Sequence, residues 1–485
     1  MVLRIACSAA LALLLSNVAG AATRCEVVLS KLGSTLSDAT CVESADLTTN
    51  NPSTTPANNS LPGLPAFAFT PQTDRATIAP DAANKTPIVK AVPGLQISAR
   101  IADDPTGQAR FLLRLPDDWN GSLVVAGASG TRSEFNGDFA WSDFVVQLGY
   151  AYASQNKGVL NLQFSTAADP LGCRLNPASP LFVRFYDNEA GQPFTRWVTY
   201  MVKAAQIAQD GVKFAYGKKP RYTYAVGTSN GGYQVRRAVE TAGKVFDGGV
   251  DWEGTYVDEE APNLLTDLPA AILNFPDYVA SGLSPASTAA KNIVAAGYPP
   301  DLVASATSSL WTNYSNAFWE VTACQWQKRL DPTYDTYVAG LGNYNYVQRR
   351  TFSDVGGRMS DFATTGEIQK PLITVAGTMD ALLPIDHHAR AYARRVAEMR
   401  DVRGARDKSP EYRLYEVQNG NHIETYKLTF PQLEFIEPHA QAAFLALVKH
   451  VEDGAPLPPS QCIPRGGVID ATPAQPGHCA NLLAP

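Results

Sequence analysis

The stretch of the chain best suited to chemistry is Gly-Thr-Ser-Asn-Gly-Gly at positions 227–232, with Ser229 inside it. A β-rich run, 222–226, precedes it and a helical pattern follows it directly. A serine on so tight a turn between a strand and a helix projects its hydroxyl out of the sheet, and the turn requires small neighbours. The surrounding glycines meet that need. The pattern predicts a nucleophilic serine, and an ordinary turn serine is the alternative.

A serine hydroxyl is a poor nucleophile without a base, and the base needs an acid that fixes its tautomer. Asp380 follows the predicted strand "PLITVAG", and His422 lies in the loop after the predicted strand "YRLYEV". We predict His422 as the general base, with a pKa near the usual 6.5 or so, and Asp380 as its partner. Asp380 could instead cap a helix, and Asp251 and Asp386 are the fallback acids.

The carbonyl oxygen under attack needs backbone N–H donors as it becomes an oxyanion. Asn230 is the first predicted donor, because its N–H lies at the start of the helix after Ser229. The loop after the predicted strand "SLVVAG" contains small residues that let the backbone approach a bound carbonyl. Ala128 and Ser129 are therefore predicted to supply the second donor, with a simple glycine turn as the alternative.

Strands and helices must alternate for these loops to meet at one edge of a sheet. From about residue 94 the chain does alternate, with a β, turn, β, α, β order up to residue 158. The alternation continues with these segments: helix 194–217, strand 222–226, helix 233–243, strand 246–252, strand 371–377, helix 387–400, strand 412–417 and helix 439–454. This order predicts a doubly wound, mainly parallel α/β sheet with helices on both faces.

Between residues 253 and 346 the alternation is lost and aromatic residues are dense. We predict an inserted, mostly helical lid, in which Trp311 and Trp319 line a substrate pocket. The alternative is that these side chains form the small core that such an insert needs. The remaining predicted divisions are a signal peptide, an N-terminal arm, two parts of the core and a Pro-rich C-terminal tail: 1–21, 22–93, 94–252 with 347–454, and 455–485.

The N-terminus carries one arginine ahead of an apolar run, 5–15, and small residues in A-x-A spacing at 19–21. This pattern is typical of a secretory signal peptide, cleaved after Ala21 or Ala22. No later segment offers 18 uninterrupted apolar residues. We therefore expect a soluble exported protein without a membrane span, either secreted or periplasmic.

Cleavage would leave six cysteines, and export favours disulfides between them. Loop length favours Cys25 with Cys41 and Cys462 with Cys479, which leaves Cys173 for Cys324. Buried free thiols are the alternative. The sequence has no C-x-x-C motif and six histidines, so neither a metal nor another cofactor is predicted.

The chain has 485 residues, of which 45% are hydrophobic and 18% charged, so it can bury a large core. Its formal net charge is -6, and it has no basic run of five or more residues. Nothing in this balance points to nucleic acid as a partner.

Four segments, "LPDDWNGSLVVAG", "GTSNGG", "AGTMDALLP" and "APLPPSQ", together resemble the α/β-hydrolase superfamily, over about residues 97 to 453. The order Ser, Asp, His agrees with that superfamily. Within it the segments are similar to secreted tannase and feruloyl-esterase-like hydrolases, which implies hydrolysis of carboxylic esters, often aromatic ones, under a lid. Members of that group usually carry bridging cysteines beside the serine and the histidine, where this chain has Thr228 and Ile423.

The "GTSNGG" segment is also similar to prolyl-oligopeptidase-type enzymes and to hydroxyalkanoate oligomer hydrolases. The first resemblance implies an N-terminal propeller, for which the residues ahead of the core are too few. The predicted partner is thus a small or oligomeric ester, either aromatic or of the hydroxyalkanoate type. A non-catalytic hydrolase fold that only binds is the third hypothesis.

Overall fold

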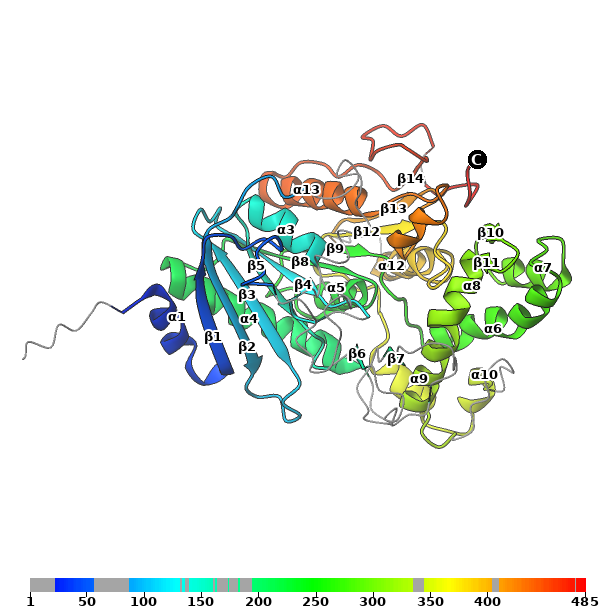
Figure 1. Cartoon of the computed structure of the whole chain (residues 1–485), viewed down its shortest axis with the longest axis horizontal. Coiled ribbons are helices and arrows are strands. Elements are labelled where there is room, and N and C mark those ends of the chain that lie inside the picture. Colours follow the sequence, from blue (N-terminus) through cyan, green and yellow to red (C-terminus); the bar gives the residue numbers. More distant parts are fainter. Residues whose placement is uncertain are drawn as a thin grey trace, which may run out of the picture.

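The computed structural model describes residues 22–55, 87–130, 133–135, 139–159, 162–163, 173, 182–183, 194–334, 344–403, 410–475 and 477–485. The predicted signal peptide lies outside these residues. The described chain is organised around one large twisted sheet (Figure 1). Its ten strands, in spatial order, are β1 (Leu36–Ser44), β2 (Gly94–Ile101), β3 (Arg110–Pro116), β5 (Ala151–Gln155), β4 (Ser122–Gly127), β8 (Tyr222–Thr228), β9 (Gly248–Trp252), β12 (Leu372–Gly377), β13 (Tyr412–Val417) and β14 (Gln461–Ile463).

Neighbouring strands are antiparallel from β1 to β5 and parallel from β5 to β14. Because parallel strands end at the same edge, the loops after β4, β8, β9, β12 and β13 share that edge. Two short ladders lie outside the sheet: β6 (Leu162–Gln163) with β7 (Phe182–Val183), and β10 (Val303–Ser305) with β11 (Ser308–Ser309).

Helices cover both faces of the sheet (Figure 1). Strand β4 shows why: Leu123 and Val125 pack in one apolar cluster, while Val124 and Ala126 pack in another on the opposite face. The first cluster includes α1 (Arg24–Leu32), α4 (Thr195–Tyr216), α5 (Asn230–Thr241) and α12 (Ala389–Arg403), and the second includes α3 (Phe139–Gln147) and α13 (Glu437–Asp453). The doubly wound α/β-hydrolase fold predicted from the sequence is therefore confirmed.

Both ends of the described chain contribute strands that the sequence analysis missed. In place of an extended arm, β1 pairs with β2 from Leu36 opposite Ile101 to Ser44 opposite Gly94. In place of a loose tail, β14 pairs with β13, with Cys462 opposite Glu416. Strand β1 has mostly exposed side chains, as edge strands often do, and β14 is only three residues long. Neither strand has enough apolar alternation to be recognised from sequence.

The insert after β9 is mostly helical, and its helices lie beyond the sheet (Figure 1). Its apolar side chains form a third core cluster together with residues of α4, α5 and the loop after β12. The insert extends past the predicted end at residue 346, because Val355, Met359 and Phe362 still pack in that core before β12 begins. Its elements are α6 (Leu264–Ala280), α7 (Thr288–Ala295), α8 (Leu310–Tyr314), η3 (Ser315–Trp319), α9 (Glu320–Leu330), α10 (Tyr346–Arg349) and α11 (Val355–Ser360). In the described part of the chain, two further short helices lie outside the insert: η1 (Gly33–Thr35) and η4 (Glu424–Leu428).

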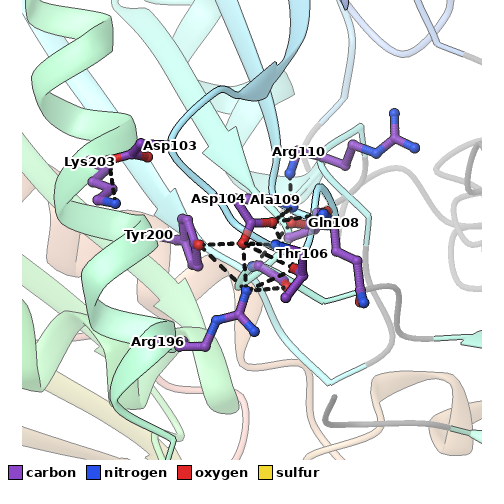
Figure 2. Close-up of polar contacts among 11 residues, drawn as sticks. Asp103, Asp104, Thr106, Gln108, Ala109, Arg110, Arg196, Tyr200 and Lys203 are labelled. Carbon is purple, nitrogen blue, oxygen red and sulfur yellow. Dashed lines mark hydrogen bonds and ion pairs between the residues drawn. The ribbon is translucent and has the colours of Figure 1, made fainter. Parts of the chain in front are cut away.

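A buried carboxylate, Asp104, ties the turn between β2 and β3 to helix α4 (Figure 2). Its Oδ2 accepts the backbone N–H groups of Gln108 and Ala109, both at 2.7 Å. Its Oδ1 lies 2.8 Å from both the Tyr200 hydroxyl and Nη2 of Arg196 on α4. Burial alone would raise the pKa of Asp104, but the hydrogen bonds from Ala109, Tyr200 and Thr106 outweigh burial and lower it. This anchored helix leads into β8 and the candidate serine.

Three disulfides are present, and they confirm the predicted pairing. Cys25–Cys41 joins α1 to β1, and Cys173–Cys324 joins Cys173, ahead of α4, to helix α9 of the insert. Cys462–Cys479 holds the last residues against β14. Among the described residues, no helix combines the length and apolarity required to cross a bilayer.

Candidate active site

Ser229 lies at the junction of β8 and α5, where the backbone turns sharply. Its φ of 59° and ψ of -120° are strained for a residue with a side chain. Its backbone N–H donates to the carbonyl of Trp252 at 2.9 Å, while its side chain does not cap the helix that it precedes. A turn serine would be expected to cap α5, so the geometry favours a hydroxyl available to a substrate.

The glycines around Ser229 are required by close backbone packing. A Cβ on Gly227 would lie 2.5 Å from the carbonyl oxygen of Gly231, and a Cβ on Gly231 would lie 2.6 Å from that of Gly127. A Cβ on Gly232 would lie 2.7 Å from the Cα of Gly254. All three distances are too short for a real side chain, so α5 approaches β4, β8 and the loop after β9 this closely only with glycine at these positions.

The structure brings Asp380 and His422 together across the ends of β12 and β13. Nδ1 of His422 lies 2.8 Å from Oδ2 of Asp380. The other oxygen, Oδ1, accepts the backbone N–H groups of Leu382 and Leu383, both at 2.7 Å. Asp380 thus forms the local backbone cap that was the alternative interpretation and also contacts the histidine. These two backbone bonds fix the carboxylate in the orientation that His422 meets.

Neither fallback acid pairs with His422. Asp251 is fully buried and accepts from Nε of Arg236 at 2.5 Å and from the Thr374 hydroxyl at 2.8 Å. Asp386 forms an ion pair with Arg390 at 3.0 Å. Both carboxylates therefore have other structural partners.

Sequence reasoning missed a second carboxyl group beside the histidine, that of Glu253. Its Oε1 accepts the backbone N–H of Gly377 at 2.9 Å, and its Oε2 lies 3.5 Å from Nδ1 of His422. Glu253 is the first residue after β9, so the rule that drew attention to Asp380, an acidic residue just past a parallel strand, could have identified it.

Glu253, Asp380 and His422 place one potential metal-ligating atom each within 4.8 Å of one another. However, Nδ1 and Oδ2 are only 2.8 Å apart, a hydrogen-bond distance. Two nitrogen and oxygen ligands of a tetrahedral ion with bonds of about 2.0–2.1 Å stand about 3.3 Å apart. The cluster therefore fits proton chemistry better than metal binding.

The two carboxyl groups of the cluster, those of Asp380 and Glu253, differ in how readily they hold a proton. Burial lowers the pKa of His422, but the charge of Asp380 and its hydrogen bond outweigh burial and raise it to about 9. Burial, followed by the charge of Asp380, raises the pKa of Glu253 well above the usual glutamate value. Glu253 therefore holds a proton more readily than an ordinary glutamate, which leaves Asp380 as the main charged partner of His422.

Of the predicted oxyanion donors, the structure disfavours one. The N–H of Ala128 donates to Oε1 of Gln234 at 2.7 Å, so it is not free to bind an oxyanion. Asn230 is the first residue of α5, so its N–H belongs to the first turn, where helix N–H groups have no partner within the helix. The carbonyl of Ser129 is held by Nζ of the buried Lys157 at 3.0 Å. Ser129 and Asn230 remain the candidate donors.

The two tryptophans predicted to line a pocket pack inside the insert. Trp311 is buried, and its indole N–H donates to the carbonyl of Pro299 at 3.2 Å. Trp319 is also fully buried, and its N–H donates to the carbonyl of Ala381 at 2.7 Å, next to Asp380. The structure argues against direct substrate contact by either indole. Their apolar character reflects the core of the insert, which the sequence analysis kept as the alternative.

The insert nevertheless contacts the loops of the candidate site. Besides Trp319, the hydroxyl of Tyr314 donates to Oδ1 of Asn421 at 2.9 Å, directly before His422. Nδ2 of Asn421 in turn donates to the carbonyl of Met379 at 2.5 Å, directly before Asp380. The side-chain amide of Asn421 therefore links the insert, the loop of Asp380 and the loop of His422.

Part of this chain is similar in sequence to known hydrolases. Residues 341–484 match the 3HB-oligomer hydrolase family. A D-(-)-3-hydroxybutyrate oligomer hydrolase of Burkholderia thailandensis is 37% identical over 128 residues, 25% of this chain and 17% of that protein. The Burkholderia mallei protein of the same name is 40% identical over 112 residues, 22% of this chain and 15% of its own length. The chain thus spans less than a fifth of the length of either relative.

Solved structures with a similar arrangement include feruloyl esterase B from Aspergillus oryzae, with a TM-score of 0.47 and 13% identity over 87% of this chain and 88% of that one. Tannin acyl hydrolase from Aspergillus niger has a TM-score of 0.44 and 14% identity over 76% of this chain and 80% of its own. The stretch matched to the family contains both Asp380 and His422. Over residues 341–484, this α/β-hydrolase-fold chain is therefore similar to the 3HB-oligomer hydrolases.

Proposed function

We propose that the protein is a secreted or periplasmic serine hydrolase that cleaves carboxylic esters, with Ser229, His422 and Asp380 as its catalytic triad. The observation that carries this proposal is the 2.8 Å contact between His422 and Asp380. These two residues lie in the loops after β13 and β12, and Ser229 directly follows β8, a parallel strand of the same sheet. The three disulfides support an oxidising compartment.

In this mechanism, Nε2 of His422 takes the proton of the Ser229 hydroxyl as Oγ attacks the ester carbonyl. The N–H groups of Asn230 and Ser129 stabilise the resulting oxyanion. His422 then gives the proton to the departing alcohol, which leaves an acyl-serine. Water attacks that acyl group with His422 again as the base, and the acid departs while Ser229 regains its proton. Asp380 stabilises the imidazolium in both halves.

The substrate that we favour is an oligoester of the 3-hydroxybutyrate type. The match over residues 341–484 supports it, since that region includes two of the three proposed catalytic residues. An aromatic ester is the second candidate, on the resemblance of four sequence segments to tannase-like hydrolases. It is the weaker candidate because Thr228 and Ile423 stand where that group usually has its bridging cysteines.

A panel of esters tests the proposal. The purified protein and its Ser229→Ala variant are incubated with 3-hydroxybutyrate oligomers, methyl ferulate and methyl gallate, and the released acids are quantified. We expect release from the oligomers by the wild-type protein and none above background by the variant. Hydrolysis of no ester by the wild-type protein, or equal hydrolysis by both proteins, would contradict the proposal.

A further inference from the structure

Glu253 has no role in the mechanism proposed above, yet its backbone conformation and its burial are unusual for a glutamate. It directly follows β9, and its φ of 52° lies in the left-handed region that a residue with a side chain seldom adopts. Its backbone N–H donates to the carbonyl of Val375 at 2.9 Å, and only 3% of its surface is exposed. The chain therefore holds a strained acidic residue inside the protein, next to the candidate histidine.

The two oxygens of Glu253 have different surroundings. Oε1 is fixed by the backbone N–H of Gly377 at 2.9 Å, which sets the plane of the carboxyl group. Oε2 is buried and has no hydrogen-bond partner among the described residues, and it lies 3.5 Å from Nδ1 of His422. A buried polar atom without a partner is costly in a folded protein, so its direction toward this nitrogen calls for an explanation.

We propose that Glu253 is a positioning residue for His422, a reserve carboxyl group that accepts the Nδ1 proton when Asp380 is lost. This inference rests on the proposed function and deepens it. In the intact site, Nδ1 donates to Asp380 at 2.8 Å, and Oε2 of Glu253 lies 3.5 Å from the same nitrogen. A shift of well under 1 Å would bring Oε2 within the usual hydrogen-bond range of about 2.7–3.2 Å.

The charges around Glu253 favour its taking the place of Asp380 as the hydrogen-bond acceptor for His422. Its neighbours are Asp380 and Glu424, which raise its pKa after burial does, and His422, which lowers it. Replacing Asp380 by alanine removes the negative charge that, after burial, raises the pKa of Glu253 most. Glu253 then ionises at lower pH than in the intact protein and can offer a carboxylate to His422. The residual activity of Asp380→Ala should consequently rise with pH as Glu253 ionises.

A double-mutant cycle tests the inference with p-nitrophenyl butyrate as the substrate. Glu253→Gln, which keeps an acceptor for Gly377, should lower kcat only modestly in the wild-type background. In the Asp380→Ala background it should lower kcat at least about 10-fold further than it does in the wild type, and it should abolish the rise with pH. An equal or smaller effect in the Asp380→Ala background would overturn the inference.

Glu424→Gln is the matched control, because Glu424 also contributes negative charge near the cluster but binds the backbone N–H groups of Ile436 and Glu437. We expect its effect to be the same in both backgrounds. If it shows the same dependence on background as Glu253→Gln, the effect is one of general charge and the reserve role is refuted.

A spectroscopic readout separates failure of this inference from failure of the proposed function. The low-field proton resonance of the His422 Nδ1–H is followed by NMR, which requires no turnover. We expect it to persist in Asp380→Ala and to disappear in Asp380→Ala/Glu253→Gln. Loss of the resonance in Asp380→Ala would refute the reserve role even if the protein hydrolyses esters. Its persistence in Asp380→Ala and loss in the double variant would support the role even if the protein hydrolyses none.

Discussion

The carboxylate of Asp380 binds Nδ1 of His422 at 2.8 Å through one oxygen and two backbone N–H groups through the other. Because the backbone donors hold Oδ1, only Oδ2 faces the imidazole. The ring is thus presented with a pure acceptor, which favours the tautomer with a proton on Nδ1 and a lone pair on Nε2. That tautomer is the one a general base for Ser229 requires.

Asp380→Asn should reduce kcat by about 10⁴-fold without unfolding the protein. The amide oxygen should keep the two backbone bonds, so the amide NH₂ would face Nδ1 and trap the wrong tautomer. Asp386→Asn is the control, since its side chain is 45% exposed and pairs with Arg390. Steady-state kinetics on a 3-hydroxybutyrate oligomer measure both variants, and comparable losses in the two would argue against Asp380 as the acid.

The rise of kcat/KM with pH should occur at a higher pH than the sequence suggests. His422 must be neutral to accept the serine proton, so kcat/KM should rise with pH through the pKa of His422 in the free enzyme. The sequence predicts an ordinary histidine value, but the carboxylate of Asp380 raises this pKa to about 9. A profile measured from pH 5 to 10 checks the shift. A midpoint at or below about 6.5 would show that the Asp380 charge does not reach the ring.

The same shift links stability to pH. The pKa of His422 is raised in the folded state, so the stability from its charged pair with Asp380 is complete below about 6.5, its unfolded value. This stability should be lost as pH rises through about 9. Denaturant unfolding of the wild type and His422→Gln measures it. The difference in free energy of unfolding between the two proteins should shrink between these pH values, and a constant difference would contradict the assignment.

The C-terminal disulfide should matter for activity as well as stability. Residues beyond Cys479 contact the histidine loop, where the amide of Asn419 donates to the carbonyl of Ala484 at 2.9 Å and accepts its N–H at 2.7 Å. Replacing both Cys462 and Cys479 by serine should lower the free energy of unfolding by roughly 2–4 kcal/mol. It should also lower kcat, because the loop that carries His422 loses this support.

The disulfide between Cys25 and Cys41 provides the matched control for this experiment. It spans 16 residues against 17 for Cys462–Cys479, so the chain-entropy effect should be similar. It joins α1 to β1 at the far edge of the sheet. Its removal should lower the melting temperature but leave kcat of the folded protein unchanged. An equal fall in kcat in both double variants would show that the C-terminal residues have no specific role.

The residues of the candidate site that directly follow a predicted strand could be predicted from the local sequence pattern. Ser229, Asp380 and His422 each follow a recognisable strand, and parallel strands bring their loops to one edge. What the sequence could not reveal depends on contacts between distant segments. The N–H of Ala128 is taken by Gln234, which is 106 residues away, and no local pattern marks that bond.

The placement of the tryptophans of the insert and of Glu253 could not be predicted for the same physical reason. A dense aromatic insert has the same composition whether its rings face a ligand or one another, and only packing distinguishes Trp319 as a buried residue. Glu253 follows its strand as Asp380 does, but its importance arises from the 3.5 Å approach to His422, which is set by the relative placement of β9 and β13.

The central claim is that Ser229 is a nucleophile, and labelling with a fluorophosphonate followed by peptide mass spectrometry tests it most directly. The reagent forms a covalent bond to a serine oxygen only where a base removes its proton. We predict a single adduct on the peptide that contains Ser229, slow or absent labelling of His422→Ala, and none in Ser229→Ala. No adduct on the wild-type protein, or an adduct on another residue that persists in Ser229→Ala together with ester hydrolysis, would contradict the claim.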